Sequence, residues 1–406
     1  MTQTTSVPEP WPAMQLRRQI TLQRGVDITK EQQRPGEVPV VSSGGPSSWH
    51  DTPIASGPGV VVGRKGSVGT VHWVSQDYWP HDTTLYVKWF GNSDRRFVYY
   101  KLVAMRLETF DTGSANPTVN RNLVHPVRVV WPRPSLQRAI ADFLDRKTAA
   151  IDALIEKKEG LIALLAEKRA ALIHQAVTKG LDPDVPMKDS GVPWIGAVPT
   201  HWDVKRLKFV CRLETGHTPS RSDPSFWIEA ECTIPWVSLN DTKTLKVNDY
   251  IGETVYRISE RGMAHSSAHL LEPGAVVFTR DATIGLTAIT TTHVAVSQHI
   301  IAWLCRPGLD NRYLLRVVNA MTEELDRLTF GATIKTIGMG DVKELVTPCP
   351  PLSEQGAIVA SLGARMGALD DAAELLRSQI DKLREYRQAL ITAAVTGQIT
   401  IPEDAA

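Results

Sequence analysis

The chain has 406 residues, more than one ordinary domain, and its length predicts about two or three domains. Hydrophobic residues make up 42%, which is enough for buried cores. The 45 Lys and Arg residues nearly balance the 44 Asp and Glu residues, so the net charge of +1 excludes a chain-wide basic field as the basis of nucleic-acid binding. Any DNA affinity must come from local clusters or from a partner's surface.

The chain carries no sign of secretion or membrane insertion. Its beginning, MTQTTSVPEPW, lacks the basic start and apolar core of a signal peptide, and no run approaches the roughly 20 apolar residues of a membrane span. The cysteines at positions 211, 232, 305 and 349 form no C-x-x-C pair and have no His at zinc-ligand spacing. We therefore expect buried thiols in a reducing compartment, no metal site, no membrane association and a cytoplasmic location.

The first half of the chain reads as a globular part followed by a long helix. Residues 1–134 contain short β segments, expected at 60–62, 71–74 and 127–131, and one helix, expected at 99–107. The next stretch, 135–180, has apolar or long side chains at alternating steps of four and three residues, the rhythm of a coiled coil, with Ser135 as N-cap and Gly180 as stop. Its predicted seam is Ile140, Leu144, Ile151, Leu154, Leu161, Leu165 and Leu172.

The second half has the same order. A proline-rich linker, 181–199, leads to a globular part at 200–352, with strands expected at 275–278 and 294–303 and a helix at 313–328. A second long helix, 353–396, precedes a tail at 397–406. Its predicted seam is Ile358, Leu362, Leu369, Leu376, Leu383 and Leu390.

These two halves are copies of one unit. Val7, Pro8, Trp11, Leu16 and Gly25 recur as Val198, Pro199, Trp202, Leu207 and Gly216, all displaced by 191 residues, the difference between positions 7 and 198. Arg64 and Gly69 face Arg280 and Gly285 at a displacement of 216, the difference between positions 64 and 280. Gly113, Thr118, Gln137 and Ile140 recur as Gly331, Thr336, Gln355 and Ile358, displaced by 218, the difference between positions 113 and 331. The second copy has therefore gained residues inside its globular part.

The repeat predicts an α+β protein with two globular domains separated by two long antiparallel coiled-coil helices, the halves being related by an approximate twofold axis. Each helix, roughly 65 Å long at 1.5 Å per residue, would otherwise expose its seam. Periodicity alone also fits a coiled coil that only dimerises. The similar globular unit attached to each helix favours a spacer.

Several blocks resemble one known family. DSGVPWIGAVPTHWDVKRLKF at 189–209 resembles the segment that opens the second target-recognition domain of type I restriction-modification specificity subunits. PPLSEQGAIVASL at 350–362 and VWPRPSLQRAIADFL at 130–144 are similar to the hinges that follow each recognition domain, and FTRDATIGLTA at 278–288 is similar to its glycine turn. The first copy departs from this pattern, since it lacks the DSGVPWIG element and its turn reads GRKGSVG.

The resemblance implies a division of labour. Each recognition domain would read one half of a split site in double-stranded DNA, and the helices would set the gap. Two methyltransferase subunits would dock on the helices and methylate adenine N6, and separate motor-nuclease subunits would join for cleavage. S-adenosylmethionine, ATP and Mg would then be bound by partner subunits, and this chain would hold no cofactor.

Catalytic motifs fail together, which agrees with a non-catalytic subunit. GVVVGRKG at 59–66 does not have the spacing of a phosphate loop, and the sequence has no N-P-P-[FY] or D-P-P-Y methyltransferase motif, no paired acidic and E-x-K nuclease cluster and no G-x-S-x-G elbow. Asn116-Pro117-Thr118 reads as a turn. An unrecognised nuclease site is a third possibility, and it would make the isolated chain nick DNA with Mg²⁺.

Candidate DNA contacts lie in turns and polar loops. Arg64 and Lys65 stand between glycines, where their cations could reach guanine edges or phosphates, and Arg280 holds the matching place in the second copy. The alternative is a hairpin turn with a solvated charge. The other candidates are polar residues of the loop after Gly113, because Asn pairs bidentately with adenine, and one lysine of the matching loop: Asn116, Asn120, Arg121, Asn122 and Lys335.

Matching scaffolds with different loops predict two different half-sites. We expect a bipartite, asymmetric DNA target whose half-site centres are about 34 Å apart, one helical turn of the duplex. The alternative function, from a different class, is a coiled-coil scaffold whose two globular domains bind proteins.

Overall fold

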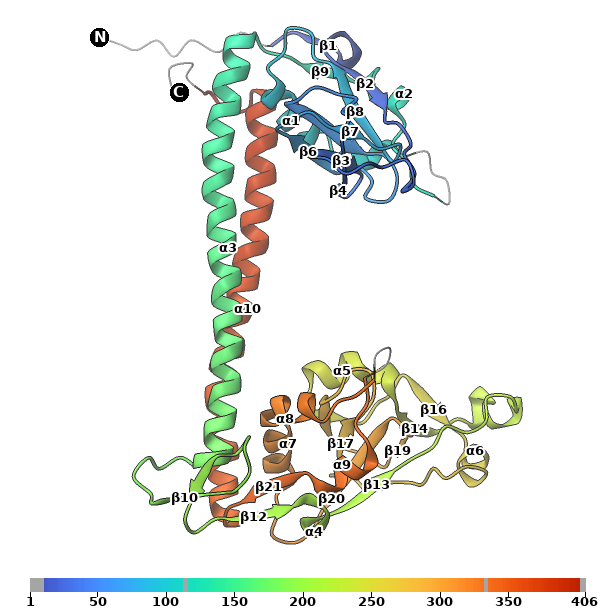
Figure 1. Cartoon of the computed structure of the whole chain (residues 1–406), viewed down its shortest axis with the longest axis vertical. Helices are drawn as coiled ribbons and strands as arrows, with labels where there is room; N and C mark the ends of the chain where they lie inside the picture. Colours follow the sequence, from blue (N-terminus) through green and yellow to red (C-terminus); the bar gives the residue numbers. More distant parts are fainter. Residues whose placement is uncertain (1–10, 112–115, 332–334, 402–406) are drawn as a thin grey trace. The chain divides into compact units, whose positions relative to one another are not determined.

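The computed structural model describes residues 11–111, 116–331 and 335–401 and divides into two compact units. Unit 1 comprises residues 1–160 and 376–406, and unit 2 comprises residues 161–375, so each unit contains part of each long helix (Figure 1). Val7, Pro8, Gly113 and the end of the predicted tail lie outside the described residues.

The long helices are α3, Pro134–Lys179, and α10, Leu352–Thr396. They run antiparallel in each unit. In unit 1, Arg387 of α10 pairs with Asp152 of α3 at 2.8 Å, and in unit 2 Arg169 of α3 faces Asp370 of α10 at 3.6 Å. The predicted α+β class with two long antiparallel helices is thus confirmed.

The buried stripe on these helices departs from the predicted seam. Ile140, Leu144, Ile151, Ile358 and Leu362 are buried. The other predicted positions of α10 and two of α3 are half-buried: Leu165, Leu172, Leu369, Leu376, Leu383 and Leu390.

The seam prediction is wrong for Leu154 and Leu161, which are 43% and 49% exposed. The inward positions are instead the following residues, Ile155 and Ile162. Leu165 and Leu172, further along the helix, keep their predicted places, so only every second position of the seam moves to the next residue and the inward residues still follow one another at steps of four and three. In α10, likewise, the buried Ile380 lies four residues after the predicted Leu376 and three before the predicted Leu383.

Unit 1 contains two sheets and a strand pair. The four-stranded sheet has the order β2-β8-β5-β6, all antiparallel, and the three-stranded sheet has the order β4-β3-β7. The strands are β1 Ala13–Gln15, β2 Thr21–Arg24, β3 Val38–Ser42, β4 Gly45–His50, β5 Gly59–Gly63, β6 Val71–Val74, β7 Trp79–Pro80, β8 Thr84–Trp89 and β9 Arg128–Val130, which pairs with β1. The short helices are α1 Arg95–Ala104 and α2 Arg121–Val124.

Unit 2 repeats this topology with an extra strand. Its main sheet has the order β13-β20-β17-β18-β15, and its smaller sheet has the order β16-β14-β19. The strands are β10 Met187–Asp189, β11 Ala197–Pro199, β12 Asp203–Arg206, β13 Cys211–Thr215, β14 Ile234–Val237, β15 Tyr250–Ile251, β16 Tyr256–Ile258, β17 Val276–Thr279, β18 Thr287–Thr290, β19 Ala295–Val296, β20 Ile300–Cys305 and β21 Val346–Cys349. The helices are α4 Leu207–Val210, α5 Thr242–Val247, α6 Glu260–Ala264, α7 Asn311–Ala320, α8 Thr322–Arg327 and α9 Met339–Glu344.

The residues gained by the second copy include a helix and the extra strand. In unit 1, β3 and β4 are joined by a two-residue turn, whereas in unit 2 α5 and β15 stand between β14 and β16. Strand β15 then adds in parallel to β18 at the edge of the main sheet.

Some local predictions need correction. The strand expected at 294–303 is two strands, β19 and β20, and the helix expected at 313–328 is broken at Met321 into α7 and α8. The predicted linker 181–199 contains the hairpin of β10 and β11, whose turn buries Ile195 in the core of unit 2. Its prolines indicated a linker, but the apolar side chains of its WIG segment and Val198 are buried or half-buried.

Each globular part packs on two helix ends. In unit 1 the core includes Ile140 and Leu144 of α3 together with Ile391 and Val395 of α10. In unit 2 the core includes Ile173 and Val177 of α3 together with Ile358 and Leu362 of α10, so the helix ends are part of each core.

Candidate nucleic-acid interface

A glycine turn follows β5 in unit 1. The Gly69 N–H donates to the Gly63 carbonyl at 2.8 Å, and the Arg64 N–H donates to the Thr83 carbonyl at 2.8 Å. Gly69 has φ +81°, and a Cβ there would lie 2.4 Å from the Glu108 nitrogen. Glycine is therefore required for both the conformation and the close approach.

The same turn follows β17 in unit 2. The Gly285 N–H donates to the Thr279 carbonyl at 3.0 Å, and the Arg280 N–H donates to the His299 carbonyl at 3.0 Å. Gly285 has φ +89°. The two turns therefore share their backbone bonds although Thr279 stands where unit 1 has glycine.

A polar loop crosses each turn. The Val119 N–H donates to the Arg64 carbonyl at 3.0 Å in unit 1, and the Ile337 N–H donates to the Arg280 carbonyl at 3.0 Å in unit 2. In unit 2 the Lys335 carbonyl also accepts a hydrogen bond from Ala282 at 2.8 Å. The structure thus brings the predicted loops beside the predicted turns.

The side chain of Arg64 lies inside the turn. It is 13% exposed, its Nε donates to the Asp82 carbonyl at 3.3 Å, and its Nη2 is buried without a hydrogen-bond partner. Burial, followed by the positive charge of Arg24, lowers the pKa of Arg64. Arg64 therefore braces the turn more than it projects from it.

Arg24 was not predicted from the sequence and stands in the same cluster. It ends β2, is 57% exposed, and donates to the Asp82 carboxylate at 2.7 Å. Burial alone would raise the pKa of Asp82, but the bond from Arg24 and the charges of His81, Arg24 and Arg64 lower it on balance. Asp82 is therefore a carboxylate that holds two arginines together.

These arginines line a cavity of about 310 Å³ in unit 1. Its charged and amide-bearing lining residues are Arg24, Arg64, Asn120, Arg121 and Asn122. Asn120 caps α2, since its side-chain oxygen accepts from the Asn122 N–H at 2.9 Å, whereas Arg121 and Asn122 are exposed. Four predicted residues thus meet at one cavity, and the exposed Lys65 and Asn116 lie near it in sequence.

In unit 2 the turn arginine has different neighbours. Arg280 is 21% exposed, and its Nε lies 3.7 Å from the Asp281 carboxylate without a hydrogen bond. Asp281 is bonded instead by Thr336 and by His299, whose Nδ1 lies 2.6 Å away. Lys335 is exposed.

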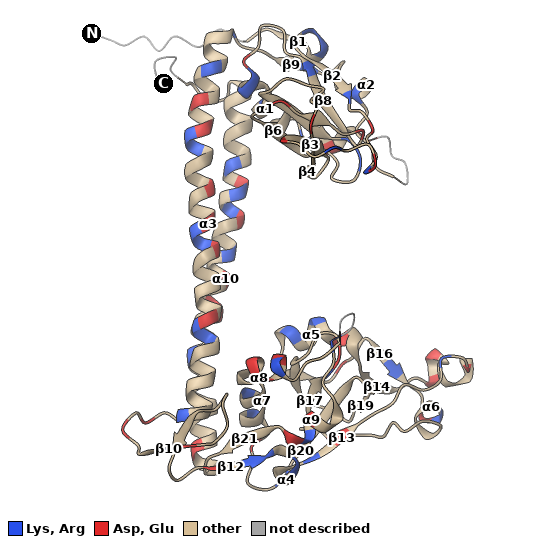
Figure 2. Cartoon of the chain, in the orientation of Figure 1, with Lys and Arg blue, Asp and Glu red and all other residues tan. Residues whose placement is uncertain are grey.

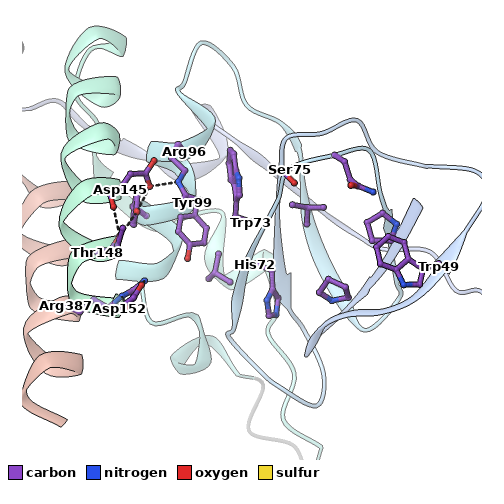
Figure 3. Close-up of a pocket in the computed structure, with 17 residues that line it drawn as sticks. Trp49, His72, Trp73, Ser75, Arg96, Tyr99, Asp145, Thr148, Asp152 and Arg387 are labelled. Carbon is purple, nitrogen blue, oxygen red and sulfur yellow. Dashed lines mark hydrogen bonds and ion pairs between the residues drawn. The ribbon is translucent and has the colours of Figure 1, made fainter. Parts of the chain in front are cut away.

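A second cavity of unit 1, of about 760 Å³, lies between the globular part and the long helices (Figure 3). The Arg96 guanidinium stacks over Trp73 and Tyr99 and bonds the Asp145 carboxylate at 2.7 Å. Tyr100 also donates to Asp145, at 2.6 Å. Its charged groups bond one another, so this network anchors the globular part on α3.

The described residues also include one group with metal-ligand spacing, Asp27, His81 and Asp82. Because the Asp82 carboxylate already accepts a hydrogen bond from Arg24, we interpret Asp82 as a partner of arginine and not as a metal ligand. No helix in the described ranges is long and apolar enough to cross a bilayer. Positive and negative residues alternate along both long helices, which therefore present no surface of a single sign (Figure 2).

The fold is that of specificity subunits of type I systems. A chain solved in a study of complex assembly and conformational transition of the type I R-M system aligns with 98% of this chain and 100% of its own length, at 18% identity and a TM-score of 0.65. The HsdS subunit from Thermoanaerobacter tengcongensis aligns over 98% and 99%, at 16% identity and a TM-score of 0.51.

Sequence relatives agree. The family model of the type I restriction modification DNA specificity domain matches residues 199–383. The type I restriction enzyme MjaIX specificity subunit of Methanocaldococcus jannaschii is 28% identical over 41% of this chain and 38% of its own length. The putative MjaX specificity subunit of the same organism is 21% identical over 74% of this chain and 65% of its own length, so the matches span less than two thirds of these relatives. Residues 199–383 thus carry a type I restriction modification DNA specificity domain, and the chain is similar in sequence to type I restriction enzyme specificity subunits and shares their fold.

Proposed function

We propose that this chain is the DNA-reading, non-catalytic subunit of a type I restriction-modification complex and acts in the cytoplasm. Its recognition domains, residues 1–134 and 200–352, each read one half of a split, asymmetric site. The observation that carries this proposal is the glycine turn, which both units build with the same backbone bonds but surround with different side chains. A common frame with different surfaces is what two different half-sites require.

The partners are proposed from the similarity to type I specificity subunits. We propose that two methyltransferase subunits, which bind S-adenosylmethionine and methylate adenine N6, dock on the long helices, and that motor-nuclease subunits supply ATP- and Mg²⁺-dependent cleavage. The long helices expose large apolar side chains among their charged residues. Exposed apolar side chains often mark protein–protein interaction sites, which supports docking there. These side chains are Leu154 and Tyr386 in unit 1 and Leu161, Leu164 and Leu375 in unit 2.

Single-molecule methylation sequencing tests the proposal directly. DNA from cells that express this chain with its neighbouring methyltransferase subunit should carry N6-methyladenine at one split, asymmetric motif, and DNA from cells without the chain should not. An active methyltransferase that methylates no motif would refute the proposal and favour a protein-binding scaffold. Nicking of DNA by the isolated chain with Mg²⁺ would favour a nuclease.

The spacer role has its own test. Lys158 of α3 donates to Gln379 of α10 at 2.6 Å, so these residues mark facing turns. Insertion of one heptad after each should lengthen the gap in the methylated motif and leave both half-sites unchanged. Altered half-sites with an unchanged gap would show that the helices do not set the spacing.

A further inference from the structure

The arginines that line this cavity of unit 1 are mostly not matched in the sequence of unit 2. At the displacement of 191 residues that relates Gly25 to Gly216, Arg24 corresponds to Thr215. At the displacement of 218 that relates Thr118 to Thr336, Arg121 corresponds to Met339. Of the three arginines at the cavity, only Arg64 has an arginine counterpart, Arg280.

The counterparts in unit 2 serve the fold. The Thr215 hydroxyl donates to the Ile300 carbonyl at 3.2 Å, across the pair of β13 and β20. Met339 packs against the core of unit 2. The positions that match Asn120 and Asn122 are glycines, Gly338 and Gly340. At these matching positions unit 2 therefore keeps one of the three arginines, Arg280, and neither of the two asparagines.

The local charge at the unit 1 cavity is positive. Three guanidinium groups line the cavity, and the Asp82 carboxylate pairs with two of them, those of Arg24 and Arg64. Asp27 lies 3.6 Å from His81. The side chain of Arg121 forms no ion pair with any residue that the structure describes. Burial, and then the charges of Arg121 and Arg17, lower the pKa of nearby His125, which agrees with a positive surrounding.

We infer that Arg24 and Arg121 form a phosphate seat, which binds a phosphate group of the DNA backbone, and that Arg64 is a positioning residue that holds Asp82 and thereby Arg24. This inference rests on the proposed function. Arg24 is exposed but fixed at its base by the bond to Asp82, and Arg121 is exposed at the start of α2, so both guanidinium groups can reach an anion at the mouth of the cavity. Arginine forms paired hydrogen bonds to phosphate oxygens, and such contacts fix register without reading sequence.

The consequence is an asymmetry in how the two domains hold DNA. Unit 1 should contribute salt-dependent anchoring through the phosphate seat, because each neutralised phosphate releases counterions. DNA binding by unit 2 should depend less on phosphate contacts at the matching positions and more on the loops of unit 2.

The test uses the complete chain in complex with its methyltransferase subunits and DNA that carries its methylated motif. The magnitude of the slope of log affinity against log salt should fall by about 0.9 when Arg24→Gln and Arg121→Gln are combined, and by less for either one alone, because both arginines bind one phosphate. The affinity of the double variant should be about 8-fold lower at 0.1 M salt, equally for the motif and for a scrambled duplex. The methylated motif should not change.

Two controls match these variants. Arg34 pairs with Asp51 at 2.7 Å in the same unit and is 66% exposed, so Arg34→Gln removes an arginine of the same kind away from the cavity and should leave the slope unchanged. Arg24→Lys and Arg121→Lys keep the charge and should restore the slope, which a merely structural role would not predict.

Each other outcome has a definite meaning. An unchanged slope in the glutamine variants, with motif binding intact, would refute the phosphate seat and leave the proposed function standing. A changed motif would make these arginines base readers and overturn the phosphate assignment. If inorganic phosphate at matched ionic strength stabilised the wild type but not the double variant, and the DNA slope were unchanged, the ligand would be a small phosphate compound. A wild-type complex that ignores DNA sequence would refute the proposed function itself.

Discussion

The two glycine turns share their backbone hydrogen bonds and differ in the side chains that surround the turn arginine. In unit 1 Asp82 bonds Arg24 beside Arg64, whereas in unit 2 Asp281 is bonded by His299 and Thr336 beside Arg280. Both copies have kept the backbone hydrogen bonds that hold the turn in its conformation. What has changed is the set of side chains at the surface, which is where sequence-specific contacts are made.

The comparison extends to the helix ends, where each copy places a tryptophan on a glycine. Trp202 lies against Gly180 after α3, and Trp11 lies against Gly397 after α10. The glycines have φ +75° and +76°. Trp202 is fully buried and its indole N–H donates to the Glu354 carboxylate at 2.8 Å, whereas Trp11 is half-buried.

The largest expected effect comes from Trp202→Ala. It should destabilise unit 2 by about 3 to 5 kcal/mol, because it removes a fully buried aromatic side chain and leaves a cavity. Trp11→Ala should destabilise unit 1 by less, about 1 to 2 kcal/mol, because less of its surface is buried. Hydrogen exchange of peptides from each unit, followed in urea, measures the two losses separately. Equal losses would show that the two contacts are equivalent despite their different burial.

The hinge glutamines should behave alike in the two copies. Gln137 accepts from the Asp94 N–H at 2.8 Å and donates to the Pro132 carbonyl at 2.7 Å. Gln355 accepts from the Asp310 N–H at 2.8 Å and donates to the Pro350 and Gly308 carbonyls. Each side chain thus joins the backbone just before a long helix to the backbone just before a short one, α1 in unit 1 and α7 in unit 2.

Replacing either glutamine by alanine should therefore cost about 2 to 3 kcal/mol, since buried backbone groups lose their partners. Gln355→Ala should cost slightly more, because it breaks three bonds. Urea unfolding of each variant, read by exchange in the affected unit, gives the values. A loss below about 0.5 kcal/mol would mean that water replaces the amide at the hinge.

A pH dependence should distinguish unit 1. The His125 Nε2 accepts a hydrogen bond from the Leu22 N–H at 3.0 Å, and Lys343 holds the corresponding position of unit 2. Burial first, and then the charges of Arg121 and Arg17, lower the pKa of His125 below 6.5. The unfolded chain therefore binds this proton more readily, so the contribution of His125 is fully present above pH 6.5 and is lost as the pH falls through the lowered pKa.

The matched variant is His125→Gln, which keeps an acceptor but does not titrate. As the pH falls from 7.5 to 5, the wild type should lose more unfolding free energy than the variant, because only the wild type gains a proton more readily when it unfolds. Taking the difference cancels the other histidines. Parallel pH curves for the two proteins would contradict the assignment.

The sequence predicted what repeats and missed what does not. Displaced matches such as Gln137 with Gln355 predicted the duplication, the two helices and their antiparallel pairing, because buried and bonding residues recur. Arg64 and the loop at 116–122 were found in the same way. Arg24 was missed because its counterpart is Thr215 and because strand pairing, not sequence proximity, brings it to the turn. The only local signal was a basic residue at the end of an alternating strand.

The seam was predicted in its course but not in its phase. A heptad placed Leu154 inward, whereas the structure places Ile155 there, because either residue satisfies an apolar pattern and only packing against the other helix and the attached core selects between them. The extra strand β15 had no signal beyond a change of displacement. A two-residue edge strand depends on the tertiary position of β18 more than on its own sequence.

The smallest expected effect concerns two arginines that hold corresponding positions in the repeat. Replacing them should change the stability of their units in different directions. Arg387 bonds both oxygens of Asp152, at 2.8 and 3.1 Å, whereas Arg169 lies 3.6 Å from Asp370 and its Nε is buried without a hydrogen-bond partner. Arg387→Met should therefore destabilise unit 1 by less than about 1 kcal/mol, the usual range for a partly exposed pair, and high salt should reduce the loss. Arg169→Met should leave unit 2 unchanged or slightly more stable, because an apolar side chain of similar length replaces an unsatisfied donor at a half-buried position. Urea unfolding at low and high salt measures both. Equal losses would show that Arg169 finds a partner in solution, and the two helix contacts would then be the same on both sides of the repeat.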